Sequence, residues 1–66
     1  MTKVRALRQA RGLNIVEFSR EARVNPSAVS CVERRKAAAS RRMQEVMSAF
    51  FGIPQAEAFD GEGMAL

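Results

Sequence analysis

The chain has no histidine, no tryptophan, no tyrosine and a single cysteine, Cys31. One cysteine cannot form a disulfide within the chain, and a zinc site of the usual kind needs several Cys or His ligands at short spacings. These shortages exclude a disulfide-stapled domain and a Cys/His zinc domain. They favour a protein that works in a reducing, cytoplasmic compartment.

Long apolar runs are also missing. A membrane-spanning helix needs about 18 or more consecutive apolar residues, and no run in this chain approaches that length. The basic N-terminal segment is not followed by the apolar core of a signal peptide. We therefore expect no contact with a membrane.

The residues that enzymes use are scarce as well. Without histidine, without paired carboxylates on one helix face and without a glycine-rich phosphate loop, no acid–base or nucleophilic constellation can be assembled. A single domain of this length buries only about 60% of the surface of its unfolded chain, which leaves a thin core with no room for a large cofactor. We expect no enzymatic activity, no cofactor, no metal and no small-molecule ligand.

Basic residues are absent from the last third of the chain. All eleven Lys and Arg residues lie in 1–42 with only three acidic ones, for a net charge of +8, whereas residues 43–66 hold four acidic residues and sum to −4. A strongly basic segment attracts polyanions, and an acidic one repels them. The charge pattern indicates one surface that meets an anionic partner and another that faces away.

What remains is a helical pattern with clear start signals. Asn14 with Glu17 has capping-box spacing, Pro26 suits a first helical turn, and Gly12 and Gly52 suit helix ends. Val29 and Val32 lie on one face of the third segment, opposite its small polar residues. We expect an all-α domain over residues 1–60, a flexible tail over 61–66, and helices over about 2–11, 14–22, 26–35, 40–51 and 54–59.

The successive segments "LRQARGL", "NIVEFSREARV", "NPSAVSCVERRK" and "MSAFFGIP" resemble the Cro/CI-type (XRE) helix-turn-helix family of phage and bacterial repressors over residues 3–60. The resemblance implies a compact five-helix, lambda-repressor-like domain whose third helix, about 26–35, enters the major groove. It implies a nucleoid-associated transcriptional regulator of the repressor type that binds double-stranded DNA at a palindromic operator as a homodimer. In the acidic half, the apolar candidates for the dimer interface are Phe51, Ile53, Phe59 and Met64.

The resemblance also assigns roles to individual residues. Arg8 and Glu33 match an ion pair that orients the third helix. The residues that match the segment facing base edges are Pro26, Ser27, Ala28, Ser30 and Cys31. Those that match positions holding DNA phosphates are Asn14, Asn25, Arg34, Lys36 and Arg41.

The chain departs from the family pattern at several positions. Ile15 replaces a glutamine that clamps phosphate, and Ser19 replaces an alanine between the second and third helices. Arg23 and Arg35 replace glycines, so a left-handed backbone at Arg23 would cost about 1 kcal/mol. Pro26 has no polar side chain for a bidentate base contact.

Other interpretations stay open. Arg5 and Arg11 fit either a DNA-facing or a merely solvated helix face, and Cys31 fits either contact with a thymine methyl or a redox sensor. Ile15 and Val16 fit an exposed apolar patch that would turn the domain into a protein-binding module of antirepressor or antitoxin type. A steep salt dependence of binding would distinguish a DNA-binding domain from a protein-binding module.

Overall fold

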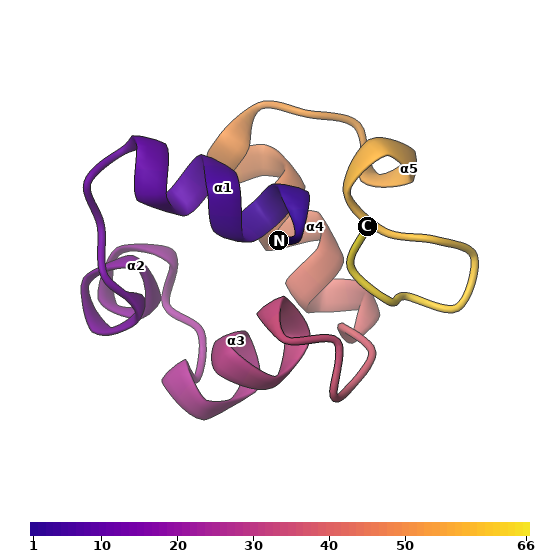
Figure 1. Cartoon of the computed structure of the whole chain (residues 1–66), viewed down its shortest axis with the longest axis horizontal. Helices are drawn as coiled ribbons and strands as arrows, with labels where there is room; N and C mark the ends of the chain where they lie inside the picture. The colour runs from indigo at the N-terminus through magenta and orange to yellow at the C-terminus, as the bar shows by residue number, and fades with distance from the viewer.

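The computed structural model describes all 66 residues and contains five helices and no strands (Figure 1). The expectation of an all-α domain is confirmed. The helices are α1 (Lys3–Ala10), α2 (Ile15–Ala22), α3 (Pro26–Glu33), α4 (Arg41–Phe51) and α5 (Gln55–Ala58). No helix has the length and apolar character needed to cross a bilayer.

The helix boundaries follow the start signals in the sequence. Asn14 and Glu17 form a complete capping box at the start of α2, and Asn25 Oδ1 accepts bonds from the first-turn amides of α3. Ser40 caps α4, and Gly52 ends it with φ +68°. One boundary differs from the expectation, because α3 stops at Glu33 and Arg35 turns the chain with φ +57°. The third helix is therefore shorter than the predicted 26–35.

The core gathers around α4, which runs behind α1 in the view of Figure 1. Its largest fully buried side chains come from four different segments and are Val4, Phe18, Val29 and Met47. The Phe18 ring stacks on Phe51, with ring centroids 5.3 Å apart. The Arg11 guanidinium lies 5.0 Å from the centroid of the Phe50 ring, a cation–π arrangement. Arg11 therefore covers the core as well as carrying charge.

The final residues contradict the predicted flexible tail. Ala65 is fully buried and forms a β-bridge with Phe59, while the Gly63 carbonyl accepts a 2.8 Å bond from the Ala39 amide. Asp60 Oδ1 accepts bonds from the amides of Glu62 and Met64 and so holds the turn. A segment with satisfied backbone groups and a buried side chain is part of the domain rather than a loose end.

Gly63→Ala should destabilise the domain by about 1–3 kcal/mol. A β-carbon at this position would lie 2.8 Å from the Ala39 carbonyl oxygen, and the backbone has φ +85°. Urea denaturation measures the change. Gly61→Ala is the matched control, since nothing lies within 4 Å of its β-carbon and its φ is not positive. Equal stability of the two variants would mean that the segment does not pack as described.

Arg23 adopts the left-handed conformation that the resemblance implied, with φ +60° and ψ +47°. Arg23→Gly should therefore raise the free energy of unfolding, but only by about 0.5 kcal/mol, because glycine also gains entropy in the unfolded chain. Arg23→Ala removes the same charge and keeps the β-carbon. Thermal melting should rank glycine above alanine, and the reverse order would refute backbone strain at this turn.

Candidate nucleic-acid interface

Helices α2 and α3 follow one another along the chain and pack against each other. Three residues, Arg23, Val24 and Asn25, join them, and the Val24 amide donates to the Ser19 carbonyl at 3.0 Å. Ser19 is buried and its hydroxyl has no partner, so the small side chain there serves packing alone. Val29 and Val32 anchor α3 to the core. The orientation of α3 is thus set by its buried side.

The opposite side of α3 carries small polar groups. Ser27 is exposed, Ser30 and Cys31 are half-buried, and the exposed Arg34 continues the same face just beyond the last helical residue. Their spacing of three and four residues places them on one side of the helix. Of the other two residues assigned to base reading, Pro26 is exposed in the first turn, whereas Ala28 packs partly against the core. Ala28 therefore lies at the margin of this face.

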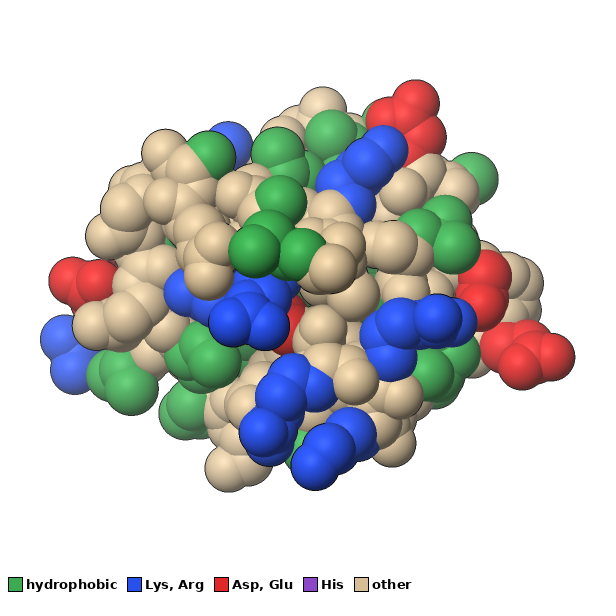
Figure 2. All heavy atoms as spheres, in the orientation of Figure 1, with side chains coloured by type: hydrophobic (Ala, Val, Ile, Leu, Met, Phe, Trp, Pro, Cys, Tyr) green, Lys and Arg blue, Asp and Glu red, His purple; other side chains and the backbone are tan.

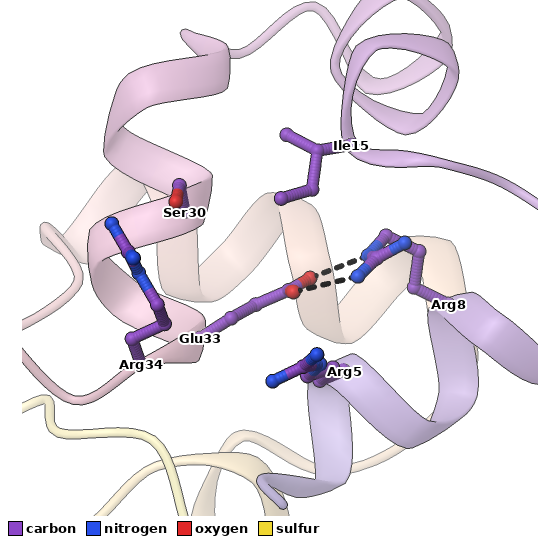
Figure 3. A pocket seen from close by; sticks show the side chains of 6 residues that line it. All are labelled: Arg5, Arg8, Ile15, Ser30, Glu33 and Arg34. Carbon is purple, nitrogen blue, oxygen red and sulfur yellow. Dashed lines mark hydrogen bonds and ion pairs between the residues drawn. The ribbon is translucent and has the colours of Figure 1, made fainter.

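The Arg8–Glu33 pair forms as the resemblance implied (Figure 3). Arg8 Nε and Nη2 donate to the two carboxylate oxygens of Glu33 at 2.7 and 2.9 Å, and Arg8 Nη1 donates to the Leu13 carbonyl at 2.7 Å. Arg8 and Glu33 are 6% and 4% exposed. Thr2 Oγ1 also donates to the Glu33 carbonyl at 3.2 Å. These bonds fasten the end of α3 to α1.

The ion pair changes the pKa of Arg8. Its hydrogen bond to Glu33 raises the pKa of Arg8 above its ordinary value, although burial acts in the opposite direction. A pKa that is higher in the folded state than in the unfolded state adds stability that is fully present below the unfolded pKa and is lost as pH rises through the folded pKa. Arginine is protonated throughout the physiological range in any case, so the shift produces no pH dependence there.

The two asparagines assigned to phosphates differ in their surroundings. Each uses its Oδ1 as a helix cap, which leaves the side-chain NH₂ free to donate. At the start of α2, however, Glu17 places a carboxylate beside Asn14. No acidic residue occupies the first turn of α3. Electrostatics therefore favours a phosphate near Asn25 over one near Asn14.

The assigned basic residues lie on an exposed segment. Arg34, Lys36 and Arg41 are all solvent-exposed in or next to the loop between α3 and α4. The same stretch exposes two further arginines that the residue assignments omitted, Arg35 and Arg42. Figure 2 shows Lys and Arg side chains gathered over α1, α3 and this loop, with most of the visible acidic side chains at the rim of the view and one partly covered beside the central basic side chains. The surface around the small-residue face is therefore basic.

Arg5 is a further residue of this surface that the sequence left undecided. It follows Thr2 by one helical turn on α1 and is half-buried beside the Arg8–Glu33 pair. A sequence signal existed, since Arg5 and Arg8 are three residues apart and must share one side of α1. What the sequence did not contain was the position of α3 opposite that side.

Comparisons with protein-family models, with curated proteins and with solved structures found no match to this chain. The structure contains no group of three or more His, Cys, Asp or Glu side chains placed to hold a metal ion.

Proposed function

We propose that this chain is a sequence-specific DNA-binding regulator of transcription, of the repressor type, that inserts α3 into the major groove. The observation that carries the proposal is the exposed small-residue face of α3, which lies beside an exposed basic loop and on a helix fixed by a buried ion pair. A reading helix needs all three features. It must approach the bases closely, be held in one orientation and be surrounded by groups that bind phosphate.

The dimensions of α3 suit this role. An α-helix with its side chains is about 10–12 Å in diameter, and the major groove of B-DNA is about 12 Å wide. Small side chains on the outer face let the backbone approach the base edges. Ser27 and Ser30 offer hydroxyls that donate or accept, and Cys31 offers a small apolar surface for a thymine methyl.

A homodimer on a palindromic operator follows from the small size of one reading helix. Half-sites one helical turn apart are separated by about 34 Å, and the domain measures 27 × 21 × 21 Å. Two copies therefore fit on successive turns without overlap. The acidic residues of 43–66 belong on the side away from DNA.

The interface candidates named from the sequence need correction. Phe51 and Phe59 are 7% and 3% exposed and belong to the core, so neither is available to a second subunit. Their burial reflects the breadth of the apolar stripe of α4 and the packing of residues 59–66 on the bundle. Ile53 and Met64 are half-buried and remain as candidates.

Lys36→Ala should weaken binding to every DNA sequence by a similar factor and reduce the slope of log affinity against log salt by about 1. Lys36 is exposed and makes no ion pair, so its loss should leave folding unchanged. Fluorescence anisotropy with a labelled duplex at several salt concentrations measures both effects. Arg20→Ala is the control, because Arg20 is an exposed residue of α2 outside the basic loop. A parent protein whose DNA affinity is insensitive to salt would contradict the proposal.

A protein-binding module is the second candidate. Val16 is 54% exposed at the start of α2, next to the half-buried Ile15. An isolated exposed valine is common on monomeric proteins, whereas a docking surface usually needs a contiguous apolar patch. Binding to a protein partner would be expected to lack the steep counterion dependence of DNA binding.

A further inference from the structure

A hollow of about 210 Å³ opens on the surface between α1, the start of α2 and α3 (Figure 3). A water molecule takes up about 30 Å³ in the liquid, so the hollow has room for an ion the size of phosphate with bridging waters. Its lining is formed by Arg5, Arg8, Ile15, Ser30, Glu33 and Arg34.

Within this lining, one carboxylate is already neutralised. Both oxygens of Glu33 accept bonds from Arg8, and this is the only ion pair in the structure. Arg5 and Arg34 therefore keep uncompensated charges on either side of Glu33 (Figure 3). Three arginines and one glutamate leave a formal charge of +2 on the lining. An anion entering the hollow would meet a net positive field despite Glu33.

The hydrogen-bonding state of Arg5 also indicates an anionic ligand. Its Nε is buried from solvent and has no hydrogen-bond partner. Leaving a buried donor unpaired is unfavourable, and a charged donor is more costly than a neutral one. The half-buried Ser30 hydroxyl supplies another donor in the same hollow, and Ile15 forms an apolar wall that excludes water on one side. An incoming acceptor with several oxygens would bond to Ser30 and to the guanidinium groups of Arg5 and Arg34 together, once the Arg5 side chain turns its Nε toward the ligand.

We propose that this hollow binds a phosphoryl group and that, in the DNA complex, its occupant is one backbone phosphodiester. The identity of that occupant rests on the proposed function, whereas the phosphoryl chemistry rests on Arg5, Arg34 and Ser30 alone. Ser30 lies on the outer side of α3, the helix proposed to read bases, and Arg34 directly follows the last residue of that helix. A phosphate held here would fix the position of α3 along the groove; Ser30 would then bind this phosphate, which leaves Ser27 and Cys31 to face the bases.

The first test titrates the ¹⁵N-labelled free protein with inorganic phosphate at constant ionic strength and follows the arginine Nε–H signals by NMR. The Arg5 signal should shift and saturate. Arg5→Gln or Arg34→Gln should weaken phosphate binding about tenfold or more, the loss expected for one charge-assisted hydrogen bond. Arg20→Gln, which removes a charge outside the hollow, should bind like the parent. Shifts that never saturate and are equal at Arg5 and Arg20 would mean general screening and would overturn the site.

The same variants show whether weaker phosphate binding results from unfolding. Arg5 Nε has no partner to lose, so Arg5→Gln should melt at or above the temperature of the parent. Weaker phosphate binding in a variant that melts normally then reports on the hollow itself. A fall in melting temperature that accounts for the lost binding would overturn the assignment of Arg5 as a ligand-binding residue.

The second test uses duplex DNA and separates this inference from the proposed function. Arg5→Gln and Arg34→Gln should each lower the salt slope, by at most about 1 because both side chains contact the same phosphate, while Arg20→Gln should not lower it. If the parent binds DNA steeply but neither hollow variant changes the slope, the DNA phosphate is not the occupant and the inference fails while the function stands. If phosphate saturates the hollow but the parent binds no DNA, the proposed function fails and the phosphoryl site remains.

Discussion

Glu33→Ala should lower the free energy of unfolding by about 3–5 kcal/mol. Arg8 is buried, and two of its three hydrogen bonds go to the Glu33 carboxylate. Removing that carboxylate leaves the Arg8 charge buried without a partner. This costs more free energy than replacing both residues of the pair by apolar ones. A domain of this length has a total stability of only about 3–10 kcal/mol. The variant should therefore melt far below the parent or fail to fold at 37 °C.

Two controls make this result specific. Glu21→Ala removes an exposed glutamate from α2 and should change stability by less than about 0.5 kcal/mol. The double variant Arg8→Met with Glu33→Met should recover a large part of the loss, because replacing a whole buried ion pair by apolar side chains is often close to neutral. If Glu33→Ala melts like the parent and only DNA affinity falls, the pair is not the fastening between α1 and α3.

Ser27→Leu should abolish the preference for the specific DNA site while leaving weak, salt-sensitive affinity for random DNA. Ser27 is exposed in the first turn of α3, so a larger side chain would hold that end of the helix away from the base edges. Loss of discrimination should be about 1–3 kcal/mol for each base position affected. Ser27 carries no charge and is not among the residues proposed to bind phosphate, so the salt slope should change little.

The Ser27→Leu substitution should not disturb folding, so a loss of specificity can be attributed to DNA contact. Ser27 is exposed, and its bond to the Asn25 cap uses the backbone amide, which leucine retains. Ser27→Ala is the matched small control and should lose less specificity, since the helix can still approach. The comparison is made by anisotropy with specific and scrambled duplexes. If Ser27→Leu and Cys31→Ala both keep the specificity of the parent while Lys36→Ala alters it, α3 is not the reading helix.

The features predictable from sequence are those set by neighbours along the chain. The capping box of Asn14 and Glu17 and the glycine stop at Gly52 depend on residues within one turn, and each lies where the sequence placed it. The Arg8–Glu33 pair spans 25 residues, and it was anticipated only through the family resemblance. Local chemistry thus determined the helices, while the long-range contact needed information beyond periodicity.

The features that sequence reasoning missed depend on contacts between distant segments. Residues 61–66 have the small, glycine-rich composition of a flexible end, yet Gly63 packs beneath Ala39 and Ala65 pairs with Phe59. Their order comes from the surface of α4 and α5, which periodicity alone does not describe. The hollow beside Arg5 likewise exists only because α1 and α3 are brought together. No local pattern distinguishes such an arginine from a solvated one.

The most direct test of the central claim is selection of bound sequences from a random pool of duplex DNA. If α3 reads bases as part of a symmetric pair, the selected sequences should converge on a palindrome with half-site centres about 34 Å, or one helical turn, apart. Affinity for that duplex should exceed affinity for a scrambled one by at least about a thousandfold at physiological salt. Recovery of no common sequence, with equal affinity for selected and scrambled DNA, would contradict the account.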